Sequence, residues 1–231
     1  MRRVSAELKA AGKAKAGVYK VRKVLKEQGL KAIQPRSFVP KTTDSRHPYP
    51  ISPNLLLERP LPQRPDQVWV GDITYIPLAG GTYGYLAVWM DLYSRKIVGW
   101  HLDDNMKEAL LIAAFKKALM NRSITREELI VHSDRGGQYA GNKFRKLLNS
   151  KPQIMQSMSR ADNPYDNAFM ESCFSRFKAE LLQDGAFDNL QDAQTEIFEY
   201  IEMYYNTNRR HSSLNYECPN NFEKNYYFYI T

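Results

Sequence analysis

Three carboxylates in this sequence stand in places where a charged side chain calls for an explanation. Asp72 lies inside a β-rich run and shares a face with Val68 and Val70, because alternate residues of a strand point to the same side. Burying a lone charge on an apolar face is costly unless something compensates it. A carboxylate placed there can bind a cation or exchange a proton. The plain alternative is a salt bridge with a nearby Arg or Lys.

The second carboxylate, Asp134, ends the short apolar run 129–134 and opens a loop that contains Gly136 and Gly137. Strand ends that lead into such loops are where open α/β sheets present functional groups. A structural role for Asp134 in a turn or a helix cap is the alternative, and such roles are common for aspartate.

The third carboxylate, Glu171, lies on a helix expected over 164–182, which starts with Asn163 as N-cap and Pro164 in the first turn. This start predicts that Glu171 is about two turns into the helix. At helical spacing two neighbouring stripes form, an apolar one (Met170, Phe174, Phe177, Leu181) and a polar one (Asn167, Glu171, Ser175, Lys178). Glu171 is therefore at the edge of the buried face, whereas a merely solvated glutamate more often lies opposite it.

The elements that must position these carboxylates alternate between strands and helices. The patterns predict strands at 68–76, 83–92, 96–102, 129–134 and 153–159, and helices at 107–121, 142–149, 164–182 and 189–205. The first three strands are joined by short turns and form an antiparallel meander. The order β-β-β-α-β-α-β-α indicates an α/β fold with a mixed central sheet.

The charge of the chain is unevenly distributed. The 231 residues hold 33 Lys plus Arg and 25 Asp plus Glu, a net of +8, yet residues 1–46 alone hold 13 basic and 3 acidic residues. This basic arm reads as two short helices around Gly12, like part of a helix-turn-helix, with Lys20, Arg22 and Lys23 on the second one. A basic arm on a near-neutral body indicates a phosphate-rich partner, although a solvated Lys-rich helix is the alternative.

Composition also excludes several classes of protein. Eight of the twelve prolines lie between Pro35 and Pro65, which predicts an extended linker between the arm and the body. No stretch approaches the roughly 20 apolar residues of a membrane span, and the first residues lack the apolar core of a signal peptide. Two scattered cysteines, Cys173 and Cys218, exclude a disulfide framework and a zinc finger of the usual spacing, which fits a reducing cytosol.

Four runs of the sequence carry a family resemblance: WVGDITY (69–75), HSDRGGQY (132–139), SMSR (157–160) and DNAFMES (166–172). Together they resemble the DDE transposases of the IS-three group of insertion sequences, whose catalytic core is retroviral-integrase-like and is made as a second-frame product. The run DLYSRKIVGW (91–100) matches that group's second and third strands. The pair Tyr205-Asn206 and the run RRHSSL (209–214) match its C-terminal signature. The match extends from about residue 1 to residue 223.

The resemblance implies a ribonuclease-H-like fold in which Asp72, Asp134 and Glu171 converge as catalytic residues and metal ligands. Three neighbouring carboxylates repel one another, and two divalent cations would relieve that repulsion. Oxygen ligands suit Mg²⁺ or Mn²⁺ rather than zinc. The implied reactions are hydrolysis at the ends of the element and strand transfer of the freed 3′-OH into DNA. The implied partners are terminal inverted repeats, target DNA and further copies of the chain, in the bacterial cytoplasm at the nucleoid, without a membrane.

Further positions acquire roles from the same resemblance. Near the reacting end, DNA contacts are expected from Lys178, Arg135, Arg160, Asn163 and Asn167. Arg209, Arg210 and His211 are expected to contact DNA or a partner subunit, and Lys20, Arg22 and Lys23 to bind DNA through the arm. Loop stabilisation is an equal alternative for Arg135 and Arg160. His132 shares the face of Asp134 and either shapes the metal site or is a core histidine. For Asp91 structural pairing at a strand end is preferred, and Cys173 is expected to be core.

The chain also departs from the family pattern. Between Asp72 and Asp134 lie 61 residues, as expected, but between Asp134 and Glu171 lie 36, one more than is usual. Residues 1–36 resemble only the later part of the family's helix-turn-helix, which predicts an N-terminally short chain. The expected domains are a partial helix-turn-helix at 1–34, the linker at 35–65, the catalytic core at 66–205 and a tail at 206–231. Alternatives are an inactive or truncated remnant that only binds DNA, and a nuclease for RNA in hybrids.

Overall fold

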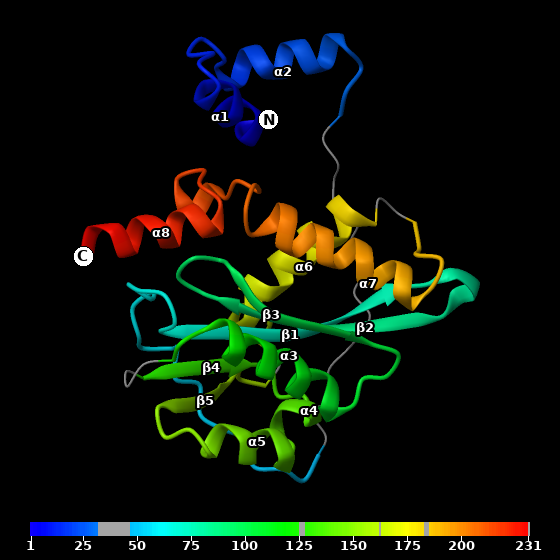
Figure 1. Cartoon of the computed structure of the whole chain (residues 1–231), viewed down its shortest axis with the longest axis vertical. Helices are drawn as coiled ribbons and strands as arrows, with labels where there is room; N and C mark the ends of the chain where they lie inside the picture. The colour runs from blue at the N-terminus through cyan, green and yellow to red at the C-terminus, as the bar shows by residue number, and fades with distance from the viewer. Residues whose placement is uncertain (32–46, 125–127, 162, 183–184, 231) are drawn as a thin grey trace.

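The computed structural model describes residues 1–31, 47–124, 128–161, 163–182 and 185–230 (Figure 1). These residues form a five-stranded sheet in the order β3-β2-β1-β4-β5. The strands are β1 (Val68–Pro77), β2 (Tyr83–Asp91), β3 (Ile97–Asp103), β4 (Leu129–Ser133) and β5 (Ile154–Met158). The first three are antiparallel to one another, and β4 and β5 run parallel to β1. The predicted mixed α/β layout is confirmed.

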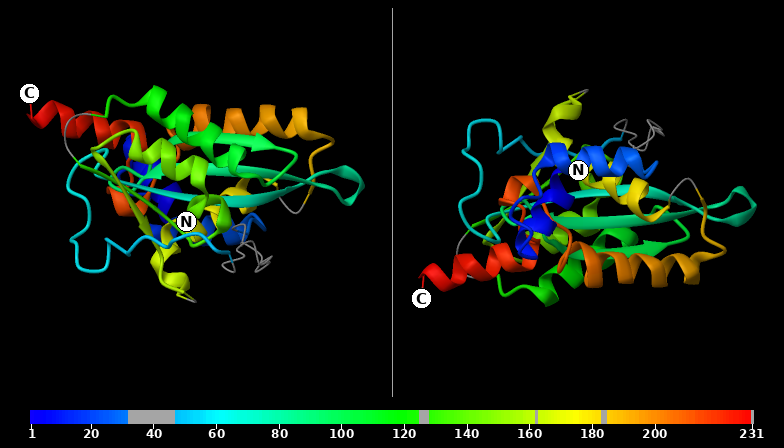
Figure 2. Two further views of the ribbon diagram at one scale, coloured as in Figure 1. Left: turned by 90° about the horizontal axis from the view of Figure 1, so that it is seen from below. Right: turned by 90° about the horizontal axis from the view of Figure 1, so that it is seen from above.

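Helices cover both faces of this sheet. One face carries α3 (Glu108–Asn121), α4 (Gly137–Ala140) and α5 (Asn142–Asn149), and the other carries α6 (Ala168–Leu181) and α7 (Leu190–Phe198). After α7 the chain continues as a π-helix, Glu199–Tyr205, and later forms α8 (Pro219–Ile230). The tip of the β1–β2 hairpin projects beyond the helices in both views of Figure 2. In the described part of the chain no helix has the length and apolar character needed to cross a membrane.

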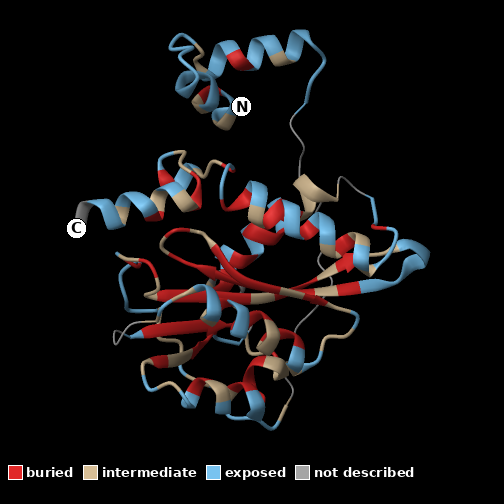
Figure 3. Cartoon of the chain, viewed as in Figure 1, coloured by how far each residue is buried: buried red, intermediate tan, exposed pale blue. Residues whose placement is uncertain are grey.

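Alternation along β1 divides the core in two. Trp69 and Ile73 join the cluster under α3 and α5, whereas Val68, Val70 and Ile76 join the cluster under α6 and α7. Figure 3 shows that most of the strand residues are buried. Position 72 therefore faces α6, which confirms the predicted face of Asp72.

The basic arm forms the two expected helices, α1 (Arg2–Ala10) and α2 (Val18–Glu27), on the α6 side of the sheet (Figures 1 and 2). Arg3 Nη2 lies 2.8 Å from Glu180 Oε1 of α6, and Glu7 pairs with Arg210. The arm thus contacts the body through ion pairs, and its lysines remain at the surface.

Part of the proline-rich linker, residues 32–46, lies outside the described residues. Its remaining part, 47–65, contains no helix or strand. Residues 52–55 nevertheless run along the outer strand β5: the Met158 N–H donates to Pro53 O at 3.3 Å and the Leu55 N–H donates to Ser157 Oγ at 2.9 Å. The linker thereby covers an otherwise open sheet edge.

Candidate active site

The first carboxylate is held by a central strand. Asp72 is half-buried on β1, and its Oδ1 accepts a hydrogen bond from the Ile73 N–H at 2.8 Å. The preceding residue can only be glycine without rearrangement, because a Cβ on Gly71 would lie 2.4 Å from the ring of Trp89. The indole ring thus packs directly on the backbone beside Asp72, which fixes the strand at that point.

The second carboxylate is brought level with the first by parallel pairing. Val68 pairs with Ile130 and Val70 with His132, so extending this register by two residues sets Asp134 beside Asp72. Adjacent strands lie about 4.8 Å apart, and equal spacing along both strands gives the two side chains the same face. Asp134 Oδ1 accepts the Gly136 N–H at 2.9 Å, so the start of the glycine loop orients this carboxylate.

The third carboxylate comes from the helix packed on that face. A 3₁₀ turn occupies Pro164–Asn167, and α6 begins at Ala168 with Asn167 as N-cap. The expected position of Glu171 two turns into the helix is therefore wrong: Glu171 is in the first turn of α6 and is exposed. The Asn167 amide donates to Gly71 O at 3.5 Å, which ties the start of α6 to β1 next to Asp72.

The charges of these groups act on one another. Burial raises the pKa of Asp72 well above its usual range, and the negative charges of Asp134 and, to a lesser degree, Glu171 raise it further. Lys178 opposes this shift with its positive charge. Burial lowers the pKa of Lys178 itself, and the charge of Asp72 offsets part of that effect. Lys178, two turns along α6 from Glu171, therefore acts on Asp72.

The donor chemistry of this group suits a hard divalent cation. In the ranges that the structure describes, no three His, Cys, Asp or Glu side chains are gathered closely enough to hold a metal ion as they stand. Three carboxylates on one face, with mutual repulsion already raising the pKa of Asp72, nevertheless form an oxygen-only set that a divalent cation would stabilise. The residues fit such an ion chemically.

His132 is a buried core histidine. Its Nδ1 lies 2.8 Å from Ser157 Oγ, and its Nε2 lies 3.1 Å from the carbonyl oxygen of Asp166. Burial lowers the pKa of His132 to about 4, so the ring is neutral at pH 7. The imidazole connects β4 and β5 to the 3₁₀ turn that leads into α6, and it acts on the site by holding that turn in place.

Two of the expected DNA contacts are engaged in the loops around the site. Arg135 Nε donates to Ser159 O at 2.6 Å. Arg160 donates to both carboxylate oxygens of Asp166, at 3.1 and 3.0 Å, and these bonds lower the pKa of Asp166 to about 2. Asn163 O accepts the Asp166 N–H at 3.3 Å. The arrangement agrees with loop stabilisation by Arg135 and Arg160.

The C-terminal group is likewise engaged within the chain. Arg209 is buried and donates through Nε and Nη2 to Glu180, at 2.8 and 2.9 Å, and Arg210 donates to Tyr216 O at 2.9 Å. His211 packs edge-on against Tyr205, and burial lowers its pKa to about 3. On α2, Lys20 and Arg22 are exposed, and Lys23 lies 3.9 Å from Glu27.

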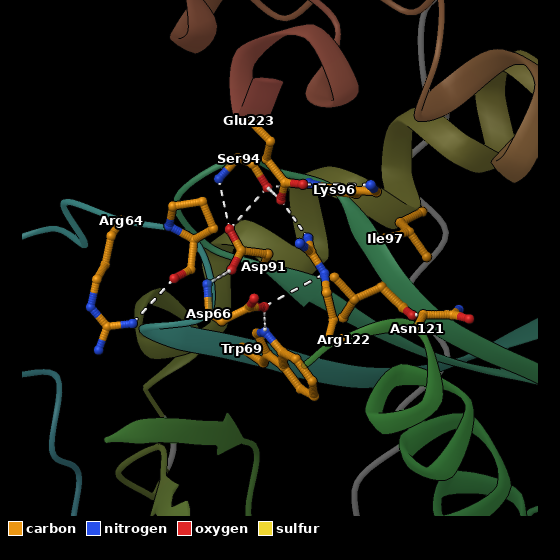
Figure 4. A network of polar contacts seen from close by, with 12 residues as sticks. Arg64, Asp66, Trp69, Asp91, Ser94, Lys96, Ile97, Asn121, Arg122 and Glu223 are labelled. Carbon is orange, nitrogen blue, oxygen red and sulfur yellow. Dashed lines mark hydrogen bonds and ion pairs between the residues drawn. The ribbon is translucent and has the colours of Figure 1, made fainter. Parts of the chain in front are cut away.

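A second group of carboxylates is built around Asp91, at the other end of the central strands (Figure 4). Asp91 is fully buried and accepts hydrogen bonds from the Ser94 N–H at 2.8 Å and from the Asp66 N–H at 2.7 Å, and its Oδ1 lies 2.9 Å from Ser94 Oγ. Glu223 of α8 accepts from Ser94 Oγ at 2.6 Å and pairs with Arg122 and Lys96. The expected structural role of Asp91 is confirmed, and Cys173 is part of the apolar core as expected.

The sequence patterns did not predict the other members of this Asp91 network. Glu223 lies on a helix that the polar and aromatic tail did not indicate, and Arg122 follows the last residue of α3. Of these residues, only Ser94 could have been found from the sequence. It follows Asp91 by three residues, and aspartate and serine at this spacing commonly close a turn.

Comparisons with known proteins agree with this geometry. Two models of the integrase core domain match residues 62–164 and 152–219. The chain is 45% identical to a transposase for insertion sequence element IS904 from Lactococcus lactis, over 74% of this chain and 67% of that one. It is 38% identical to transposase InsF for insertion sequence IS3A of Escherichia coli, over 96% of this chain and 75% of that one. The catalytic core of HTLV-2 integrase, solved with magnesium, superposes with a TM-score of 0.52 at 17% identity over 70% of this chain and 98% of that one, which confirms the ribonuclease-H-like fold.

Proposed function

The chain belongs to the integrase-core transposases of IS3-type insertion sequences, and from this premise we propose that it cuts the ends of an insertion element and joins the freed 3′-OH to target DNA. The observation that carries the proposal is the convergence of Asp72, Asp134 and Glu171. They come from three separate segments to one face of the sheet, where the charges of Asp134 and Glu171 both act on Asp72.

Asp72, Asp134 and Glu171 are the residues that would hold two Mg²⁺ or Mn²⁺ ions. When bound, such ions lower the pKa of an attacking water and stabilise the leaving oxygen of a phosphodiester. The chain's own contribution is to place the carboxylates. Ile73 N–H and Gly136 N–H orient Asp72 and Asp134, while the Asn167 contact with Gly71 places the first turn of α6, which carries Glu171.

Lys178 is the cation that faces this site from α6. Its half-buried ammonium is attracted by Asp72, and a phosphate entering the site would bring a second negative group within its reach. We assign Lys178 to the phosphate beside the reacting bond. Arg135, Arg160, Asn163 and Asn167 would shape the loops that border the DNA, and Arg135 and Arg160 would reach phosphate only by giving up part of their present bonds.

We assign the remaining parts of the chain by the same reasoning. The arm, residues 1–34, would bind DNA through Lys20, Arg22 and Lys23, followed by the linker at 35–65, the catalytic core at 66–205 and the tail at 206–231. Arg209, Arg210 and His211 would stabilise the body rather than read DNA, because Glu180, Glu7 and Tyr205 already engage them. Joining two DNA ends calls for more than one copy of the chain, acting on the bacterial nucleoid in the cytoplasm.

The test is a strand-transfer assay with Mg²⁺ and duplexes that carry the terminal sequences flanking the gene. We expect the wild-type chain to cleave and join these ends, and Glu171→Gln to bind them without cleaving. The matched control is Glu199→Gln, which changes an exposed glutamate outside the site and should leave the rate unchanged. Cleavage by Glu171→Gln at the wild-type rate would contradict the assignment. Binding without joining by the wild-type chain would instead identify an inactive remnant.

A further inference from the structure

Arg95 stands out among the partly buried cations of the described chain. It lies in the turn between β2 and β3 with a positive φ of 61°, a left-handed conformation that is uncommon for a residue with a side chain. The turn itself is closed by backbone bonds, from the Arg95 N–H to Asp91 O at 2.9 Å and from the Asp91 N–H to Lys96 O at 2.8 Å. Glycine would adopt this conformation with less strain, so closing the turn does not require arginine.

The Arg95 guanidinium has a donor that no described residue uses. Its Cζ lies 4.3 Å from the centroid of the Phe169 ring, and its Nη1 is buried without a hydrogen-bond partner. Within the described residues the side chain forms no ion pair and no hydrogen bond. The ring compensates the charge only in part, because a cation–π contact leaves the N–H donors free in the plane of the guanidinium.

Two other arginines show how a guanidinium is paired with carboxylates elsewhere in this protein. Arg122 pairs with Asp66 and Glu223, and Arg209 forms a two-pronged pair with Glu180. A buried cation is expensive unless it is paired in this way. Within the described residues no carboxylate bonds to Arg95, and the charge of Asp91 acts on it without a bond. An anion that does bond to it would therefore come from a ligand.

The position of Phe169 indicates which anion that is. Phe169 is 38% exposed in the first turn of α6, two residues before Glu171. An exposed aromatic ring beside an arginine with free donors matches the two chemical parts of a nucleotide, since the ring packs against a base or sugar and the guanidinium binds a phosphate.

We propose that Arg95 and Phe169 form a nucleotide subsite beside the start of α6, in which Arg95 binds a DNA backbone phosphate and Phe169 packs against the adjoining sugar or base. This inference rests on the proposed function and extends it to a second contact on the α6 side of the site. The strain of the left-handed turn is then the structural cost of keeping a guanidinium beside the start of α6.

The experiment measures the affinity of the full chain for a fluorescein-labelled duplex carrying the terminal sequences that flank the gene. Fluorescence anisotropy is recorded over a salt series without divalent cations, so that the DNA stays intact. We expect Arg95→Gly to weaken binding about tenfold and to reduce the salt slope by about one. Its Tm should stay the same or rise, because the change relieves the left-handed turn and removes a buried cation.

Two further variants separate the parts of the pair. Arg95→Lys keeps a charge and should retain part of the affinity and the full salt slope. Phe169→Leu should weaken binding about threefold without changing the salt slope. The matched control is Lys117→Ala, since Lys117 lies 5.2 Å from the ring of Trp100 and forms the same kind of contact away from α6. This control should leave the affinity unchanged.

Arg95→Gly with wild-type affinity and an unchanged salt slope would overturn the subsite and leave the proposed function intact. So would an affinity loss that accompanies a large fall in Tm and is shared fully by Arg95→Lys, since that pattern belongs to a structural turn. If the wild-type chain itself does not bind the duplex, the proposed function fails, and the subsite fails with it.

Discussion

The molecule contains two groups of carboxylates beside the central strands of the sheet, and they are built in opposite ways. Around Asp91 the buried carboxylates are surrounded by donors: Ser94, the Asp66 N–H, Arg122 and Lys96 (Figure 4). Around Asp72 the described donors are few, and the neighbouring charges are mostly of the same sign. In the first group the negative charges are compensated by donors and cations of the protein itself. In the second group they are largely uncompensated and remain available to a ligand.

The difference shows how to separate structural from functional charge in a protein of this size. Both groups contain aspartates whose pKa is raised by burial, so the direction of the shift alone does not distinguish them. What distinguishes them is the supply of hydrogen-bond donors and opposite charges. Functional sites commonly keep uncompensated charges of the same sign. If the protein compensated these charges itself, the ligand would have nothing left to bind.

The largest expected effect concerns the Asp72 group. Asp134→Asn should lower strand-transfer activity by at least about 10³-fold, because the site loses a carboxylate ligand. The free energy of unfolding should stay the same or rise, since Asp72 loses its strongest negative neighbour. Strand-transfer rates and urea unfolding of the same preparation check both parts. A variant that lost stability and activity in parallel would place Asp134 with the structural carboxylates.

The next largest effect concerns the Asp91 network. Asp91→Ala leaves the Ser94 N–H and the Asp66 N–H without their acceptor, whereas Ser94 Oγ keeps Glu223, and we expect a loss of about 3–5 kcal/mol in the free energy of unfolding. Activity per folded molecule should remain within a few-fold of wild type. The control is Asp104→Ala, an exposed aspartate whose removal should leave the urea midpoint unchanged. Equal midpoints for the two variants would mean that the network contributes little.

A pH titration sharpens the same contrast. Burial raises the pKa of Asp91 to about 6, against an ordinary value of 3.8, so the folded chain holds this proton more tightly than the unfolded chain. The stabilising contribution is therefore fully present below about pH 4 and is lost as the pH rises through about 6. Across this window wild type should lose roughly 2–3 kcal/mol relative to Asp91→Asn, at about 1.4 kcal/mol per pKa unit. A pH-independent difference would show that Asp91 titrates normally.

The smallest expected effect tests redundancy within the network. Lys96→Ala should cost about 0.5–1 kcal/mol, because Glu223 keeps its bonds to Ser94 and Arg122 when the partly exposed ammonium is removed. Activity should not change. Thermal unfolding is sufficient to measure this difference, and a loss above about 2 kcal/mol would mean that Lys96 is essential to the charge balance around Glu223.

Local patterns predicted the parts of the site that depend on local geometry. Alternation along residues 68–76 gave the face of Asp72, and the polar loop after 129–134 gave the position of Asp134. The start of α6 was placed too early, because Asn163-Pro164 and Asn167 both resemble helix starts, and the first of them begins only a 3₁₀ turn. Which of two adjacent caps begins the α-helix is decided by tertiary contacts such as the bond from Asn167 to Gly71.

Long-range pairing was beyond the reach of sequence patterns. Glu223 meets Ser94 and Arg122 across more than a hundred residues of chain, and α8 carries too irregular an apolar pattern to indicate a buried acid. The left-handed turn at Arg95 was equally hidden, since arginine gives no local signal for that conformation. The pairing of Glu223 follows from partners brought together only by the folded sheet.

The parallel pairing of β1 with β4 also governs when this protein becomes capable of chemistry. The two helices of the arm are held by backbone bonds between neighbours in the chain, and such contacts form quickly. The candidate site needs carboxylates separated by 61 and 36 residues. Bringing them together costs the entropy of closing long loops. A newly made or partly unfolded chain thus has its basic arm long before its carboxylates converge. On the proposed function, only molecules that have finished folding would be able to cut DNA.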